Sequence, residues 1–251
     1  MLLEIERLSK RFGGVHAVAE CDLAIADRQV FGLIGPNGAG KTTLVNLISG
    51  HLRADQGRIR FADADVTRLP PHALAARGIA RTFQGVRLFK GLSALENVLV
   101  GRHARMRPDA LRRLWPRGSP DRPDRARAES LLARVGLAPH AKALAGELSY
   151  GDQRRLEIAR ALASEPRLLL LDEPAAGMNP TETARLRELM RTLVAEGLTI
   201  VLIEHDVRLV MGTCERVAVL SFGRKIAEGT PAEVQASAVV REAYLGAEDV
   251  A

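Results

Sequence analysis

The chain has 251 residues, a formal net charge of +6 at pH 7 and two cysteines. This length suits one large domain, or a domain with a smaller appendage, and argues against two domains of equal size. Two cysteines are too few for a disulfide framework, no apolar run reaches the roughly 20 residues that cross a bilayer, and 4% aromatic residues argue against a base-stacking platform for single-stranded nucleic acid. The basic excess suits either an anionic partner or plain solvation.

Two strands are predicted at the N-terminus, one over residues 2–8 and one near residues 17–25. Together they indicate an antiparallel layer. Phe12 stands just beyond the first strand. Its ring either stacks on an adenine face, with Val18 beside it, or fills a place in the core.

A phosphate-binding loop is predicted at residues 35–43, which match the pattern G-x-x-x-x-G-K-[ST]. A buried strand over residues 30–34 precedes it and a helix follows. The glycines let successive backbone N–H groups turn toward a phosphate chain, and the helix N-terminus adds the positive end of its dipole. We expect Lys41 to reach the β- and γ-phosphates of a nucleoside triphosphate and Thr42 to be a ligand of Mg²⁺. The residues expected to hold the nucleotide are Asn37, Gly38, Ala39, Gly40, Lys41, Thr42 and Thr43.

The next predicted elements are a strand over residues 57–61, a short helix over 70–77 and a strand over 79–84. Gln84 ends the last of these strands. Its carboxamide can both accept and donate a hydrogen bond, which makes it a candidate ligand of magnesium and water.

A mainly helical insert is predicted over about residues 85–148, within an α/β core formed by about residues 1–84 and 149–251. Ser93 and Glu96 form a capping-box signature that opens a helix. Arginines and prolines crowd residues 102–127 and rule out one long helix there. We expect an exposed loop or a broken helical excursion, which is either a solvated surface or a contact surface for anions such as lipid headgroups.

Two further stretches carry chemistry. Ser149 stands at the N-cap position of an amphipathic helix, which indicates a second anion site. A buried parallel strand is predicted over residues 167–173, and it ends in Asp172 and Glu173. Asp172 can hold Mg²⁺, and Glu173 can accept a proton from an attacking water, because adjacent strand residues face opposite ways.

The C-terminal third continues the α/β alternation. Thr181 is expected to cap a helix that runs to Glu196, and a buried strand over residues 198–203 follows. His205 comes directly after this strand, at the edge where α/β sheets place ligands. Two short strands come next, and Thr230 is expected to cap the helix after them.

This ordered set resembles the ATP-binding subunit of ABC transporters over nearly the whole chain. Four segments narrow the resemblance to the first of the two ATP-binding subunits of bacterial branched-chain amino acid importers. These segments are residues 81–89, 150–159, 175–180 and 243–246. The resemblance implies a P-loop ATPase fold, with a RecA-like α/β core, an N-terminal antiparallel layer and a helical subdomain, whose ATP and Mg²⁺ chemistry drives transport.

The resemblance also implies a role for each matching residue. Phe12 stacks on adenine, and Gln84 and Asp172 serve the Mg²⁺. Glu173 is the general base and His205 contacts the γ-phosphate. Ser149 and Gly151 bind the γ-phosphate of the ATP held by a partner subunit.

The implied partners are a second ATP-binding subunit, identical or paralogous, two membrane permeases and, indirectly, a periplasmic solute-binding protein. The place implied is the cytoplasmic face of the inner membrane, with Val86, Leu88 and Phe89 docking on the permeases and no nucleic acid bound. Two residues depart from the general family pattern. Tyr150 replaces a signature glycine and Asn179 replaces an aspartate, and both match the importer subfamily.

Two alternatives stay open. One is the ATPase subunit of a complex that extracts lipid or lipopolysaccharide, since such subunits share much of the core pattern. The other is a nucleic-acid-associated ABC ATPase, which the basic composition suggests. The transported solute cannot be read from this chain, because the binding protein and the permeases select it.

Overall fold

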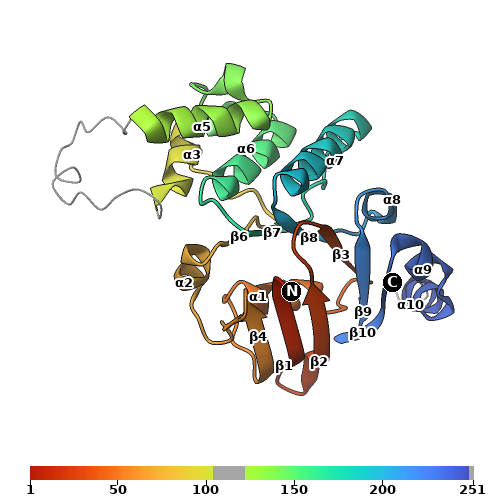
Figure 1. The fold of residues 1–251 in the computed structure, drawn as a ribbon. Helices are drawn as coiled ribbons and strands as arrows, with labels where there is room; N and C mark the ends of the chain where they lie inside the picture. The colour runs from red at the N-terminus through yellow and green to blue at the C-terminus, as the bar shows by residue number, and fades with distance from the viewer. Residues whose placement is uncertain (104–121, 249–251) are drawn as a thin grey trace. The chain divides into compact units, whose positions relative to one another are not determined.

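The computed structural model describes residues 1–103 and 122–248 of the chain (Figure 1). The chain divides into two compact units, one formed by residues 1–81 and 167–251 and the other by residues 82–166. The predicted helical insert, residues 85–148, lies inside the second unit. That unit also contains residues 82–84 and 149–166.

The first unit opens with an antiparallel sheet of strand order β2-β1-β4-β5. Its strands are β1 (Leu3–Phe12), β2 (Val15–Ile25), β4 (Gln56–Phe61) and β5 (Ala64–Asp65). The predicted antiparallel layer is therefore confirmed. The first strand runs further than predicted, because Phe12 pairs with Val15 across the hairpin and so ends β1.

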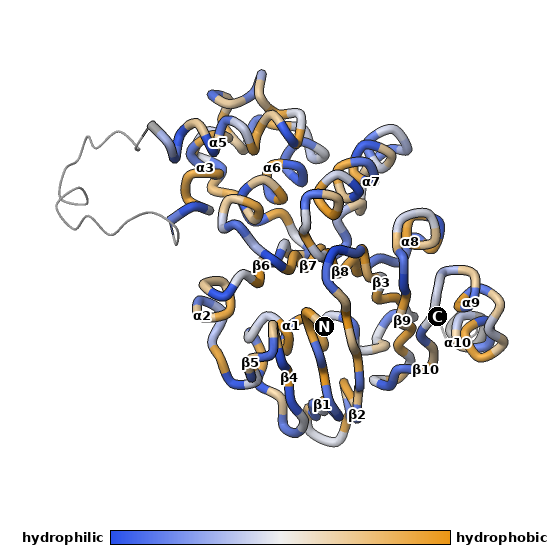
Figure 2. Tube along the Cα trace, viewed as in Figure 1, coloured by the Kyte–Doolittle hydropathy of each residue, from blue (hydrophilic) through white to orange (hydrophobic). Residues whose placement is uncertain are grey.

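The second sheet of this unit has the order β10-β9-β3-β8-β7-β6. Its strands are β3 (Val30–Ile34), β6 (Ile79–Arg81), β7 (Leu168–Asp172), β8 (Thr199–Ile203), β9 (Arg216–Ser221) and β10 (Arg224–Gly229). All pairings are parallel except that of the edge strand β10. Every residue of β3, β7 and β8 is buried, as strands covered on both faces require. Figure 2 shows β3 and β7 in the orange of hydrophobic residues.

Helix α1 (Lys41–Ile48) shares one hydrophobic core with both sheets. Leu44 and Ile48 are among its buried side chains, and they cluster with Leu8 of the antiparallel sheet and Leu170 and Val201 of the parallel sheet. This core fixes the first turn of α1 at the carboxyl end of β3. The short helix α2 (Pro71–Ala76) precedes β6.

Helix α7 (Pro180–Ala195) begins differently from the prediction. Thr181 is not its N-cap. Asn179 holds that position, because its side chain accepts a hydrogen bond from the Glu182 N–H at 2.9 Å and the Glu182 carboxylate accepts one from the Asn179 N–H at 2.9 Å. This reciprocal pair is a capping box, and it places Pro180 at the first helical position, where a missing N–H costs nothing.

Three helices complete the first unit: α8 (Val207–Met211), α9 (Pro231–Ala236) and α10 (Ala238–Glu248). The predicted cap of α9 is confirmed, since the Thr230 side chain accepts from the Glu233 N–H. Helix α10 was not predicted as an element. It carries the tail segment that contributed to the resemblance.

The second unit contains α3 (Ala94–Gly101), α5 (Arg122–Arg134), α6 (Tyr150–Leu162) and two short 3-10 turns, Ala138–His140 and Ala145–Glu147. The capping box of Ser93 and Glu96 is confirmed. Most of the basic segment, residues 102–127, lies outside the described residues. Its end is helical, because α5 begins at Arg122 with Pro123 in its first turn, where proline is tolerated, and this agrees with the predicted broken helical excursion.

None of the helices in the two described stretches has both the length and the apolar character that a membrane span needs.

Candidate functional site

The phosphate-binding loop has the backbone that its glycines predict. Gly38 has φ +78° and Gly40 has φ +100°, both in the left-handed region that favours glycine. A Cβ at Gly40 would lie 2.2 Å from the Ala17 carbonyl oxygen, whereas a Cβ at Gly38 would meet no atom within 4 Å. The loop therefore packs tightly against β2 on one side and leaves open space on the other, which fits a cradle for a phosphate chain.

The first turn of α1 has no side-chain cap on its N–H groups. Gly40 is its N-cap and offers no side-chain acceptor to the first N–H groups of the helix. Thr42 is exposed in this turn and Thr43 is half-buried. Both hydroxyls therefore stand beside the positive end of the helix, where phosphate oxygens are favoured.

Lys41 is held inside the loop. Its Nζ donates to the carbonyl oxygen of Gly35 at 2.6 Å and to that of Pro36 at 2.9 Å. Burial lowers the pKa of the Lys41 ammonium below its ordinary value, and the nearby carboxylates of Glu173 and Asp172 counter this in part. The lysine and the two predicted acidic residues therefore share one electrostatic site.

Asp172 ends β7 and is paired with a residue that sequence reasoning left without a role. The Arg81 guanidinium donates to the Asp172 carboxylate at 2.8 Å, with side-chain exposures of 6% and 3%. Arg81 also donates to Asn46 Oδ1 at 2.5 Å and to Ser49 Oγ at 3.1 Å. This arginine thus ties the predicted magnesium ligand to the helix of the phosphate loop.

Glu173 does not continue the strand. Its φ is +49°, and its N–H donates to the Ile203 carbonyl oxygen at 2.9 Å. The prediction that strand alternation directs Asp172 and Glu173 to opposite faces was therefore wrong in its reason, because β7 ends at Asp172 and Glu173 is not in a strand conformation. The left-handed backbone of Glu173 sets the direction of its side chain. Backbone strain of this kind in a residue other than glycine clusters at functional sites.

Glu204 is a second residue that sequence reasoning passed over, although it follows a fully buried strand. Its side chain is buried and accepts from the Ala175 N–H at 2.9 Å. Burial raises the pKa of the Glu204 carboxyl, and the Ala175 N–H opposes this rise. The neighbouring His205 has 65% of its side chain exposed, with Nδ1 3.9 Å from the Glu204 carboxylate. The histidine is thus free to face a ligand while its neighbour anchors the backbone.

The predicted adenine contacts differ in their burial. Phe12 is 48% exposed, and the Lys10 ammonium lies 5.5 Å from the centroid of its ring. Val18 is completely buried and belongs to the core of the first unit. Of the two residues, only Phe12 offers exposed surface.

Three predicted site residues belong to the second unit. The Ser149 side chain accepts from the Asp152 N–H at 3.2 Å, which confirms Ser149 as the N-cap of α6. Gly151 is buried in the first turn of this helix, and Gln84 is exposed beyond the end of β6. The predicted strand 79–84 thus ends at Arg81, three residues before Gln84.

The donor set suits Mg²⁺, which takes few protein ligands and binds largely through phosphates and water. Within residues 1–103 and 122–248, no three His, Cys, Asp or Glu side chains gather as a metal site. A hydroxyl from Thr42 and one carboxylate from Asp172 are the oxygen ligands that a nucleotide-bound magnesium ion needs.

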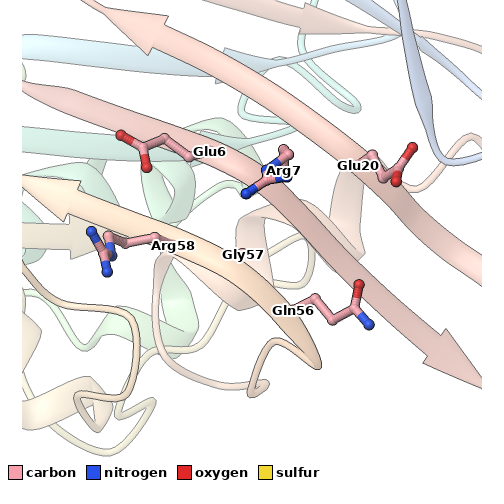
Figure 3. Close-up of a pocket in the computed structure, with 6 residues that line it drawn as sticks. All are labelled: Glu6, Arg7, Glu20, Gln56, Gly57 and Arg58. Atoms are coloured by element: carbon pink, nitrogen blue, oxygen red, sulfur yellow. The ribbon is translucent and has the colours of Figure 1, made fainter.

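A pocket of about 440 Å³ lies elsewhere, on the antiparallel sheet (Figure 3). It is lined by exposed side chains of both charges and by glycine: Glu6, Arg7, Glu20, Gln56, Gly57 and Arg58. None of the predicted site residues lines it. The candidate site is therefore not this pocket but the group of residues at the phosphate loop and at the ends of β7 and β8.

Comparison with known proteins agrees with this geometry. The profile of the ABC transporter family matches residues 18–176, and that of the branched-chain amino acid ATP-binding cassette transporter family matches residues 224–250. The chain is 43% identical to the high-affinity branched-chain amino acid transport ATP-binding proteins BraF of Pseudomonas aeruginosa and LivG of Escherichia coli, covering 98% of this chain and of each relative. It is 36% identical to the lipopolysaccharide export system ATP-binding protein LptB of Acidithiobacillus ferridurans, covering 98% and 97%.

Two solved structures extend the comparison. The ADP conformation of the ATP-binding cassette MJ1267 matches with a TM-score of 0.87 and 33% identity over 98% of both chains. A dimeric post-hydrolysis cassette, MJ0796 bound to ADP and phosphate, matches with a TM-score of 0.77 and 25% identity over 92% of this chain and 99% of that chain. The fold, the phosphate loop and these full-length similarities together show that the chain belongs to the ABC transporter family of ATP-binding proteins.

Proposed function

We propose that this chain is the ATP-hydrolysing subunit of an importer for branched-chain amino acids or related small solutes. The observation that carries the proposal is the 43% identity, over 98% of both chains, to two branched-chain amino acid transport ATP-binding proteins. The match of residues 224–250 to a family of that same transport class supports it independently at the C-terminus. Identity to the lipopolysaccharide export protein is lower, at 36%, which favours the importer over the lipid alternative.

The geometry of the first unit supports the roles that we propose for its residues. Lys41 binds the β- and γ-phosphates after leaving the carbonyls of Gly35 and Pro36, and Thr43 donates to the α-phosphate. Thr42 and Asp172 hold the Mg²⁺, which neutralises phosphate charge when bound. Glu173 takes the proton from the attacking water, and His205 contacts the γ-phosphate.

The proposal has this chain act in a pair. The Ser149 and Gly151 N-terminus of α6 would bind the γ-phosphate of ATP held by a second subunit, identical or paralogous, while Gln84 serves its own chain's Mg²⁺. The dimeric state of the MJ0796 cassette supports a pair of this kind. Loss of the shared γ-phosphate removes the charge that attracts both helix termini, so the pair reopens.

The coupling to transport is proposed for the second unit, whose exposed Phe89 would dock on a membrane permease with Val86 and Leu88. Phe89 is 51% exposed. A periplasmic binding protein would select the solute, and the ATPase pair would lie against the cytoplasmic face of the membrane.

The test is ATP hydrolysis by the reconstituted complex with its permeases. We expect Glu173→Gln to lower kcat about 100-fold or more, as loss of a general base does, while ATP binding persists and a dimer accumulates. The exposed Glu188 of α7 gives the matched control, since Glu188→Gln removes the same charge away from the site. Hydrolysis by Glu173→Gln at the wild-type rate contradicts the role of the base. Uptake of labelled leucine into proteoliposomes tests the importer, and lipopolysaccharide extraction without leucine uptake favours the alternative.

A further inference from the structure

Arg154 is a buried arginine of α6 that none of the roles above uses. Its side chain is 2% exposed. Its Nη1 donates to the carbonyl oxygen of Phe83 at 2.8 Å, and its Nη2 donates to the carbonyl oxygen of Gln84. Helix α6 therefore binds, through Arg154, the backbone carbonyl of the predicted magnesium ligand Gln84.

Tyr150 completes this arrangement from the first turn of the same helix. Its phenol oxygen accepts from Arg154 Nε at 3.2 Å and from Nη2 at 2.9 Å, and the guanidinium lies 5.3 Å from its ring centroid. Glu157 accepts from Nη1 at 3.4 Å. With these contacts, all three guanidinium nitrogens are engaged, and the planar fork is fixed in one orientation.

The same helix holds the segment after Gln84 at a second point. The Glu157 carboxylate accepts from the Arg87 N–H at 3.3 Å, and the Arg87 guanidinium lies 4.3 Å from the Phe83 ring centroid. Residues 83–87 are thus bound to α6 at both ends. A glycine at position 150, as in the general family signature, could supply neither the phenol oxygen nor the ring.

We propose that Tyr150 and Arg154 of helix α6 are positioning residues that fix the backbone position of Gln84 in the same chain. This proposal rests on the proposed function, because it matters for catalysis only if Gln84 serves the nucleotide. Tyr150 follows Ser149 directly. A γ-phosphate bound at Ser149 therefore acts on the residue that orients Arg154, and through it on the Gln84 backbone. The departure of Tyr150 from the general signature gains a physical reason, since it is the acceptor that orients the arginine.

The sharpest variant is Tyr150→Phe, which removes one oxygen from a side chain that is 46% exposed and keeps the ring. We expect kcat of the reconstituted complex to fall about tenfold, the size expected from one hydrogen bond to a charged group, with KM for ATP unchanged, because Lys41 and its loop lie in the other unit. Arg154→Lys should also lower kcat although it keeps the positive charge, since an ammonium cannot reproduce the hydrogen bonds of the planar guanidinium. The double variant Tyr150→Phe/Arg154→Lys should be no slower than Arg154→Lys alone, since both act through one contact.

Amide hydrogen exchange gives a readout that needs no activity. Exchange at residues 83–87 should be faster in Tyr150→Phe than in the wild-type chain, because the clamp on their carbonyls is weakened. Arg102→Gln is the matched control. Arg102 is a buried arginine of the same unit, but its partners are Asp124 and Glu165, at 2.9 and 3.2 Å.

Wild-type kcat and wild-type exchange in Tyr150→Phe overturn the proposal. An equal fall in kcat for Arg102→Gln also overturns it, because the effect would then reflect general loosening of the unit. Failure of the proposed function looks different. In that case the wild-type complex takes up no labelled leucine, while the exchange difference at residues 83–87 between Tyr150→Phe and the wild-type chain persists.

Discussion

The pair of Arg81 and Asp172 offers the most direct test of how the site is held together. Replacing Arg81 with methionine keeps much of the side-chain volume and removes the charge. The side chain of Asp172 is 3% exposed and its carboxylate lies 2.8 Å from the Arg81 guanidinium, so the variant leaves a buried carboxylate without this partner. Breaking a buried ion pair in this way costs about 3–5 kcal/mol.

A surface pair of the same residue types provides the control. Arg58 and Asp65 lie 3.3 Å apart with side-chain exposures of 59% and 56%. Exposed pairs of this kind contribute about 0–1 kcal/mol. Urea unfolding should therefore give a lower midpoint for Arg81→Met than for Arg58→Met at a similar slope. The free energies of unfolding of the two variants should differ by about 2–5 kcal/mol. A loss below about 1 kcal/mol in both variants refutes the reasoning, because the pair with Arg81 would then contribute no more than an exposed pair.

Magnesium and ATP should act differently on the two variants. In the proposed site a divalent cation near Asp172 replaces the charge that Arg81→Met removes. Saturation with Mg–ATP at about 100 times the dissociation constant stabilises a protein by about 2.7 kcal/mol. Magnesium should add to the stabilisation by ATP more strongly in Arg81→Met than in Arg58→Met. Equal magnesium effects in both indicate that the ion does not approach Asp172.

Three further predictions follow from single contacts. Gly40→Ala should abolish ATP binding measured by calorimetry, because its Cβ would lie 2.2 Å from the Ala17 carbonyl oxygen, whereas Gly38→Ala has open space and should cost only the left-handed backbone strain of about 1–2 kcal/mol. Asn179→Ala should destabilise the chain to urea by about 1 kcal/mol, whereas Thr181→Ala should change stability little, because Asn179 is the N-cap of α7; equal losses contradict the observed cap. Burial raises the pKa of the Cys21 thiol from 9.0 to about 11, so between these pH values the folded chain keeps the proton that the unfolded chain loses. The stabilising effect is complete below pH 9 and is lost as the pH rises toward 11. Cys21→Ala should therefore reduce the fall in the free energy of unfolding over that interval.

The sequence predicted the elements whose signals are local. The phosphate loop, the strand ending at Asp172 and the cap at Ser149 each depend on neighbours within a few residues, and spacing alone reveals them. The Thr181 cap failed for a local reason too. Asn179 and Thr181 are both good N-cap residues, and only the Glu182 three residues after Asn179 favours the first.

Arg81 and Arg154 could not be assigned from spacing. The partner of Arg81 is 91 residues away in sequence, and the Phe83 carbonyl is 71 residues from Arg154. Each arginine is one of many basic residues in a basic chain, and nothing near it in sequence marks it as buried. Only the topology, which sets β6 beside β7, brings Arg81 to the acidic strand end. Pairing at that range is a property of the fold, so a motif search does not find it.

The turn after β7 holds the proposed base, Glu173, in a strained backbone conformation. Glu173 has φ +49°, which costs roughly 1–2 kcal/mol for a residue with a Cβ. Two hydrogen bonds to the end of β8 hold it there, from the Glu173 N–H to the Ile203 carbonyl at 2.9 Å and from the Ala175 N–H to the Glu204 carboxylate at 2.9 Å. Because His205 follows Glu204 directly, the proposed base and the proposed γ-phosphate contact stand on one hydrogen-bonded frame. The buried Glu204 therefore links the turn that carries Glu173 to the strand end that carries His205.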